Sequence, residues 1–166
     1  MIRTAACTLL LILATPVLAQ TSSGLAGLDT NGPIDVSSDS GTLASRDGRA
    51  VLNGNVRVAQ GNLKLASDRA TITYLTVAGN PQIQRLDASG GVTLTAPTET
   101  ARSQFAIYDL NKRIITMIGG VVLTRQGGNQ VRSQRLIYDL NSGRANVDGG
   151  AQGGRVTGRF TVPDRQ

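Results

Sequence analysis

Residues 102–111, RSQFAIYDLN, and residues 132–141, RSQRLIYDLN, are two copies of one segment that lie 30 positions apart. Two weaker copies of its beginning occur as Ser-Asp pairs earlier in the chain. We call the first serine of each copy a start serine; they are Ser38, Ser67, Ser103 and Ser133, separated by 29, 36 and 30 residues. Self-similarity with a period of about 30 residues indicates a repeat architecture, and a repeat fixes the fold of the whole chain.

A glycine marks a second fixed point in every unit. It follows three of the start serines after 16 residues, whereas the second unit reaches it only after 23. These landmark glycines are Gly54, Gly90, Gly119 and Gly149. The second unit therefore carries seven extra residues, which we place in the turn-rich stretch 78–81, AGNP.

The units alternate apolar and polar residues with period two, as half-buried strands do. The alternation is clear in residues 54–58, 62–65, 70–74 and 91–96, and turn-forming residues stand at 47–48, 61–62, 111–112, 127–129 and 141–143. No helical spacing of apolar residues occurs after residue 20. The sequence therefore predicts an all-β domain of repeated antiparallel strands.

Alignment of the units places apolar side chains at equivalent positions, and side chains two residues apart share one face of a strand. The predicted inward face consists of Leu43, Leu52, Val56, Val58, Leu65, Ile72, Leu86, Val92, Leu94, Tyr108, Met117, Val121, Leu123, Tyr138 and Val147. This set is poor in bulky aromatic residues. It predicts either a thin ordinary core or a cleft that receives an apolar ligand.

The amino-acid composition excludes several kinds of catalytic and metal-binding site. Among 166 residues there is no His and one Cys, Cys7, which excludes His-dependent triads, His metal sites, cysteine clusters and an intrachain disulfide. Glu99 is the only Glu, and the Asp residues lie mainly at turns. We therefore expect no catalytic residue, no metal and no cofactor, although a carboxylate pair or a Ser-Lys dyad is formally possible.

The first 19 residues have the pattern of a cleaved secretory signal peptide: basic Arg3, an apolar run at 5–14, and a small-residue site at Ala19. The run is shorter than the about 20 residues needed to span a membrane. We expect an exported chain with a flexible lead-in at 20–33, one domain at 34–162 and a tail at 163–166. The formal net charge of +6 becomes +5 when Arg3 is removed with the signal.

The repeat resembles the OstA-like family. The segments that carry the resemblance are residues 36–39 (VSSD), 52–58 (LNGNVRV), 65–70 (LASDRA), 102–109 (RSQFAIYD) and 119–121 (GGV). The resemblance covers residues 34–162 and rests on four weak copies together with the signal peptide. It implies a twisted β-jellyroll that is open at both ends, and a periplasmic lipopolysaccharide transport protein that shields lipid A acyl chains in an apolar groove.

The resemblance also implies partners: lipopolysaccharide, an LptC-like protein at the inner membrane, an LptD-like protein at the outer membrane, and further copies head to tail. We expect open strand edges to make these contacts. The predicted edge residues are Ile34, Val36, Arg155, Val156, Arg159, Phe160, Thr161 and Val162. The extra residues of the second unit depart from the family pattern and are expected to alter one rim of the groove.

Two other functions stay open. One is an exported β-repeat scaffold that polymerises end to end, and the other is an LptC-like component, against which the cleavage site at Ala19 argues. The basic surplus either binds lipid phosphates or forms a solvated face. Nucleic acid is not an expected partner, because the exported chain lacks the aromatic residues that stack on bases.

Overall fold

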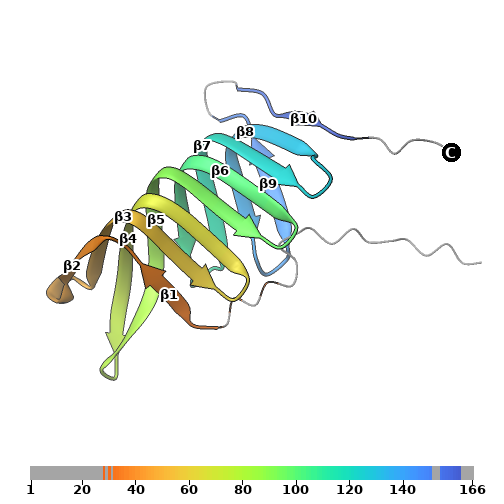
Figure 1. The fold of residues 1–166 in the computed structure, drawn as a ribbon. Helices are drawn as coiled ribbons and strands as arrows, with labels where there is room; N and C mark the ends of the chain where they lie inside the picture. Colours follow the sequence, from red (N-terminus) through yellow and green to blue (C-terminus); the bar gives the residue numbers. More distant parts are fainter. Residues whose placement is uncertain (1–27, 29, 31, 151–153, 162–166) are drawn as a thin grey trace, which may run out of the picture.

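Ten antiparallel strands form one sheet in the computed structural model, which describes Leu28, Thr30, residues 32–150 and residues 154–161 (Figure 1). The strands are β1 (Ile34–Ser37), β2 (Ser40–Ala44), β3 (Arg49–Gln60), β4 (Leu63–Val77), β5 (Asn80–Ala96), β6 (Glu99–Asp109), β7 (Ile114–Arg125), β8 (Gln130–Asp139), β9 (Arg144–Asp148) and β10 (Thr157–Arg159). The expected signal peptide lies outside the described residues. The predicted all-β class is confirmed, and a single 3-10 turn, η1 (Ser45–Asp47), is the one helical element within the described part.

Strand order follows the sequence from β3 to β8, with each strand paired to the next as an antiparallel hairpin. β1 and β2 both pair with β3, and β9 and β10 both pair with β8. The sheet is therefore a meander with an N-terminal end at β1 and β2 and a C-terminal end at β9 and β10.

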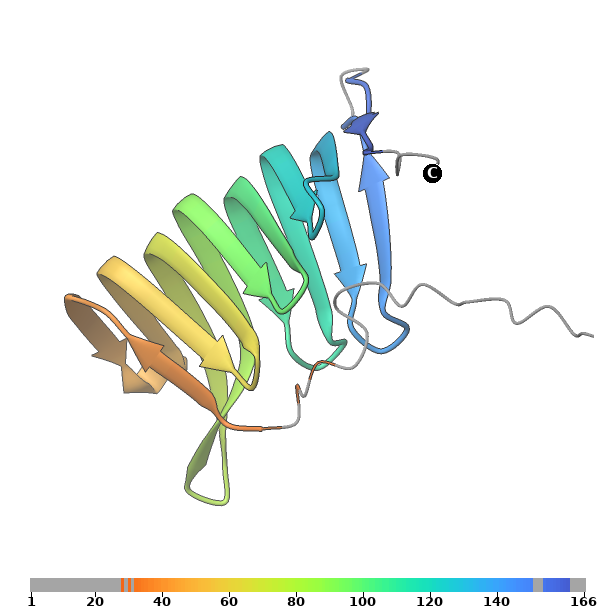
Figure 2. The same cartoon turned by 45° about the vertical axis from the view of Figure 1, so that its right-hand side comes forward.

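The sheet is folded in half along a line that crosses every long strand (Figure 2). Pairing shifts register at equivalent points of successive strand pairs, for example between Asn53 and Val56 and between Ser89 and Val92. We call the two halves layer A and layer B. Layer A contains β1, β10 and residues 56–60, 63–66, 92–96, 99–102, 121–125 and 130–132. Layer B contains β2, β9 and residues 49–53, 69–77, 80–89, 105–109, 114–118 and 135–139.

The start serines and landmark glycines lie on this line and form its corners. Each start serine donates its hydroxyl hydrogen to the carbonyl oxygen two residues ahead, at 2.8 Å for Ser103 and 3.1 Å for Ser133. In the corner formed by β4 and β5, Gly90 of β5 has a φ of 82°, a backbone conformation that favours glycine. A Cβ on Gly90 would lie 2.7 Å from the Cβ of Asp68, which follows a start serine. The corner therefore has no room for a side chain at the glycine.

The fourth unit differs from the predicted pattern by one residue. Gly150, with a φ of 79°, faces Gln134 there, whereas a Cβ on the predicted landmark Gly149 would meet the carbonyl of Gly154. The 16-residue spacing that holds in the other regular units becomes 17 at the C-terminal end, where the chain leaves β9.

The seven extra residues lengthen the β4–β5 hairpin at the predicted place. Its two-residue turn is Ala78-Gly79, with φ values of 50° and 83°, and the hairpin projects beyond the other strands of layer B (Figure 1). A register shift follows Thr73, and the backbone N–H of Tyr74 donates to the carbonyl of Gly48 at 2.8 Å. The projection borders the N-terminal end of the sheet.

We expect Gly90→Ala to destabilise the protein far more than Gly79→Ala. Both glycines have a φ near +80°, so that each alanine costs about 1 kcal/mol of backbone strain. Only Gly90 is also crowded, by the Asp68 side chain, whereas nothing lies within 4 Å of a Cβ on Gly79. Urea denaturation should show a total loss of about 3 kcal/mol for Gly90→Ala. Equal losses for the two variants would contradict the corner contact.

Candidate functional site

The space between the two layers is lined by apolar side chains in unbroken cross-strand rows. One row in layer B runs Leu43, Ala50, Ile72, Leu86, Tyr108, Ile115, Tyr138 and Ala145, and one in layer A runs Val36, Val58, Leu65, Leu94, Ala101, Leu123 and Val131. Directly opposed residues of neighbouring strands share a face, so each row is continuous from the N-terminal to the C-terminal end. We call the space that these rows enclose the groove.

Most residues of the predicted inward set are buried in this groove. They are Val56, Val58, Leu65, Ile72, Leu86, Val92, Leu94, Tyr108, Met117, Val121, Leu123 and Tyr138, and Leu52 and Val147 pack against them half-buried. Sequence reasoning did not single out Leu63, Ile115, Leu136 and Leu140, or the buried alanines, which fill the same space. Contact of these residues with a lipid stays a prediction.

Leu43 is on the inner face but is not buried. It pairs with Ala50 in the row described above, yet its side chain is 75% exposed because β2 is the edge of layer B. Together with Ile72, Tyr74 and Ile83 it lines a hollow of about 440 Å³ at the N-terminal end. Leu43 therefore lies on the predicted inward face but forms part of an open mouth of the groove, and its contact with lipid stays a prediction.

The middle of the groove is filled by its own side chains. The free volume between the layers is only about 20 Å³ beside Val58, Leu65, Leu86 and Tyr108. Beside Tyr138 it is about 0 Å³. Of the two interpretations of the thin lining, the ordinary core describes the middle and the open cleft describes the N-terminal mouth. An apolar ligand enters the middle only if the layers separate.

Polar side chains join the layers along the side opposite the corners, which we call the open side. Tyr108 Oη of layer B donates to Gln60 Oε1 of layer A at 3.0 Å. One repeat later, Tyr138 Oη donates to Glu99 Oε1 at 2.5 Å. Arg125 Nε donates to Glu99 Oε2 at 3.1 Å, and the Glu99 side chain is only 3% exposed. These contacts hold the two layers together where the turns end.

Burial raises the pKa of the Tyr138 hydroxyl, and the hydrogen bond to Glu99 raises it further. Burial likewise raises the pKa of Tyr108, against a smaller opposing effect of Arg113. Both hydroxyls therefore remain protonated donors at neutral pH. The recurrence of Tyr in both IYDLN copies indicated an inward aromatic residue, but nothing in the sequence pointed to Gln60 or Glu99 as its partner.

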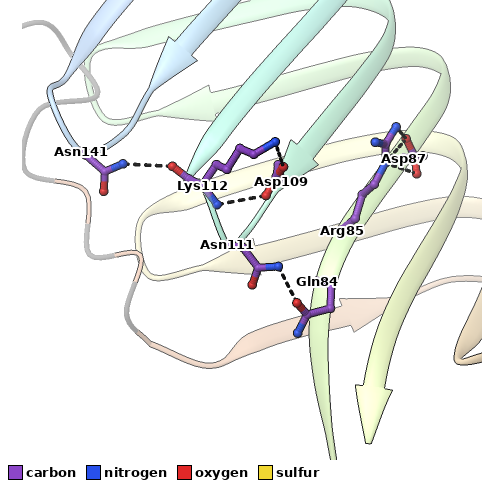
Figure 3. A network of polar contacts seen from close by, with 7 residues as sticks. All are labelled: Gln84, Arg85, Asp87, Asp109, Asn111, Lys112 and Asn141. Carbon is purple, nitrogen blue, oxygen red and sulfur yellow. Dashed lines mark hydrogen bonds and ion pairs between the residues drawn. The ribbon is translucent and has the colours of Figure 1, made fainter.

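The turns of layer B are tied to one another by the residues after each tyrosine (Figure 3). Asp109 Oδ1 accepts the backbone N–H of Lys112 at 3.0 Å, and this bond, more than the Lys112 ammonium, lowers the pKa of Asp109. Asn141 Nδ2 donates to the Lys112 carbonyl oxygen at 3.0 Å. Asn111 Nδ2 makes an equivalent contact with Gln84 Oε1. The Asp-Leu-Asn part of the repeat thus shapes each turn and links it to the one before.

The outer face of layer A carries exposed basic residues. Arg57, Arg102 and Arg132 lie in one cross-strand row with outward orientation, and Lys64 lies beside them. Arg57 and Lys64 border an open hollow of about 550 Å³ together with Thr93 and Thr95. The basic surplus expected from the composition is therefore displayed outside the groove on this face. Its binding of phosphates stays a prediction.

The predicted edge strands lie at the two ends of the sheet. Ile34 is half-buried against the core, and Val36 is 36% exposed on β1. At the other end the expected strand 155–162 is wrong in length, because β10 covers only Thr157–Arg159. Short pairing with β8 leaves Val156 and Phe160 exposed, at 43% and 66%.

Of the remaining predicted edge residues, Arg159 ends β10, and Arg155 and Thr161 lie near it in the sequence. Arg155 and Arg159 are exposed, the Thr161 backbone N–H donates to Asn129 Oδ1 at 2.8 Å, and Val162 lies outside the described residues. Residues 28, 30, 32–150 and 154–161 include no helix long and apolar enough to cross a membrane. Within the same ranges no group of three or more acidic, His or Cys side chains is placed to hold a metal.

Comparison with known proteins identifies relatives of this chain. Residues 35–144 match the family described as LptA/(LptD N-terminal domain) LPS transport protein. An uncharacterized protein of Rhizobium meliloti (strain 1021) is 31% identical over 153 residues, which cover 87% of this chain and 81% of that protein. The crystal structure of LptH of Pseudomonas aeruginosa, the LptA-homologous periplasmic component of the lipopolysaccharide transport device, superposes with a TM-score of 0.70. It is 21% identical and covers 81% of this chain and 99% of LptH, which establishes the shared β-jellyroll fold.

We expect Tyr138→Phe to lower the free energy of unfolding by about 1–3 kcal/mol, because it leaves the buried Glu99 carboxylate without one donor. Tyr74→Phe is the matched control, since the half-buried Tyr74 packs against the core through its ring. It should change stability by less than about 0.5 kcal/mol. Chemical denaturation of both variants measures the difference, and a neutral Tyr138→Phe would show that the open side is not held by this contact.

Proposed function

The chain belongs to the LptA and LptD N-terminal-domain family of lipopolysaccharide transport proteins, and from this premise we propose that it carries lipopolysaccharide across the periplasm. In this proposal the acyl chains of lipid A lie between layers A and B, and the sugar part stays outside. The export signal expected at residues 1–19 delivers the chain to the periplasm, where the related LptH works.

The continuous apolar lining is the observation that carries the proposal. Buried polar side chains in the described residues are confined to the two margins of the groove. Those at the corners are Ser67, Ser103 and Ser133, and those at the open side are Thr30, Gln60 and Glu99. Between these margins an acyl chain would meet apolar side chains. Such a site binds by burial of methylenes and needs no specific polar contact with the chain.

Magnitudes favour opening of the groove by a lipid. Separation of the layers costs the hydrogen bonds of Tyr108, Tyr138 and Gln60, each a net contribution of about 0.5–1.5 kcal/mol, and the apolar contacts between the layers, which the acyl chains would replace. One acyl chain of about twelve methylenes contributes about 10 kcal/mol when it leaves water. The packed middle is thus compatible with a carrier whose empty state is closed.

We propose that partners join at the two ends of the sheet. The outer edges of β1 and β10 have no neighbour among the described strands, and unpaired edges accept further strands. Leu43 and Phe160 are exposed at opposite ends, which suits head-to-tail contact between copies. An LptC-like protein at the inner membrane and an LptD-like protein at the outer membrane would extend the same lining.

One alternative has an observation in its favour. The filled middle of the groove also suits a scaffold that polymerises end to end and carries no lipid. Lipid binding by a single copy separates the two functions, because a scaffold offers its ends only.

A photoreactive amino acid at position 72 should label with lipopolysaccharide in cells, and one at position 73 should not. Ile72 faces the mouth of the groove and is 6% exposed, whereas the adjacent Thr73 points to the opposite face of the same strand. Immunoblots for lipopolysaccharide-linked protein after irradiation measure the labelling. Equal labelling at both positions would refute the placement of the acyl chains between the layers.

Phe160→Ser should weaken the self-association of the protein, because it removes an exposed aromatic side chain at the C-terminal end. Phe105→Ser is the matched control: Phe105 is 49% exposed but lies on the outer face of layer B, away from both ends. Sedimentation velocity at rising concentration should show shorter oligomers for Phe160→Ser alone. An unchanged distribution for Phe160→Ser would exclude this end contact.

A further inference from the structure

The open side of the groove binds the chain's own residues that precede β1. Thr30 is only 8% exposed, and the Leu28 side chain packs against the core. Gln60 Nε2 donates to the carbonyl oxygens of Thr30 at 2.7 Å and of Gly32 at 3.2 Å. Arg113 donates a guanidinium N–H to Thr30 Oγ1.

These contacts connect layer A with layer B. Gln60 ends β3 in layer A, and Arg113 stands in the turn between β6 and β7 in layer B. Tyr108 Oη of layer B donates to the same Gln60 amide. A chain of hydrogen bonds thus leaves layer B at Tyr108, crosses to layer A at Gln60, and returns to layer B through Thr30 and Arg113.

We propose that Leu28, Thr30 and Gly32, which we call the strap, hold the open side closed in the empty protein and compete with lipid for the same position. This inference rests on the proposed lipid-carrying function. The strap supplies hydrogen-bond acceptors and apolar cover at the open side when the two layers are together. Its carbonyl oxygens accept the buried Gln60 N–H groups, which would otherwise lie unpaired at the margin of an apolar space. Leu28 covers apolar surface there in the way that the end of an acyl chain would.

Displacement of the strap follows from the same geometry. Because Gln60, Thr30 and Arg113 bridge the layers, a lipid that pushes the layers apart must break these bridges first. Once the strap leaves, Gln60 and Arg113 face the boundary between the acyl chains and the polar part of the lipid. There the sugar hydroxyls, amides or phosphates can accept the same hydrogen bonds. The strap and the cargo therefore exclude each other.

A reversible staple tests this inference. In a Cys7→Ser background the chain has no other cysteine, so Thr30→Cys and Arg113→Cys can be joined by a short bismaleimide with a reducible centre. The stapled protein should bind fluorescently labelled lipid A at least tenfold more weakly than wild type. Cleavage of the staple with a reductant should restore binding to the wild-type level or above it.

The control staple joins Lys112→Cys to Asn141→Cys, two neighbouring turns of layer B that are hydrogen-bonded in the structure (Figure 3). It adds the same chemistry without bridging the layers and should leave lipid A binding unchanged. A second variant, Leu28→Ser, loosens the strap and should make binding several-fold tighter and association faster.

The outcomes separate the two proposals. Wild-type protein that does not bind lipid A at all refutes the lipid-carrying function. If the Thr30→Cys/Arg113→Cys protein binds lipid A with the same affinity before and after stapling, Leu28, Thr30 and Gly32 are a static anchor and the proposed competition is wrong. Weaker binding by Leu28→Ser would likewise contradict competition between strap and lipid.

Discussion

The close contact between a landmark glycine and the residue after a start serine is the constraint on which the fold depends. At Gly54, Gly90 and Gly119 the backbone has a positive φ, and the facing side chain of Asp39, Asp68 or Gln104 occupies the position of a missing Cβ. A second positive φ follows at the next residue, Asn55, Gly91 or Gly120. Two such residues in succession bend the strand. Because the first three units bend at the same register, and the fourth bends one residue later, a flat meander becomes two facing layers.

The bend also sets the size of the residues inside. On β4, β5 and β6 the row beside the corners contains Ala70, Ala88 and Ala106, whereas on β7 and β8 the same row contains Met117 and Leu136. One row further toward the open side the same strands carry Ile72, Leu86 and Tyr108, where the gap is wider. From β4 to β6 the shortage of bulk that suggested an unfilled cleft therefore reflects small residues beside the corners, and composition alone cannot distinguish the two.

The sequence predicted those features of the fold that depend on residues close together in the chain. The 30-residue repeat and the alternation gave the strands, the inward face and the place of the extended hairpin, because each depends on residues close in sequence. The side-chain contacts across the groove could not be predicted from local patterns. Tyr108 and Gln60 lie 48 positions apart, Tyr138 and Glu99 lie 39 apart, and alternation shows which face a residue is on without naming its partner.

The two ends were the least predictable part. Leu43 obeys the alternation and is still exposed, because burial requires a neighbouring strand that the edge lacks. The C-terminal strand shrinks to three residues for a related reason. Glycines at 149, 150, 153 and 154 lie between β9 and β10 in the sequence, so nothing in the local sequence holds the last strand in register.

Closure of the empty groove would change how tightly the proposed carrier binds its cargo. The apparent affinity for cargo falls by the fraction of protein that is in the open state. A closed state favoured by about 2 kcal/mol therefore lowers the apparent affinity about 30-fold. That weakening serves transport, because burial of several acyl chains alone would make release very slow. In the proposed carrier, the hydrogen bonds of Gln60, Tyr108, Glu99 and Tyr138 would re-form when a lipid leaves, so part of the free energy lost on release would be recovered within the protein. A groove that was open and dry when empty would lack that compensation and would hold its cargo more tightly.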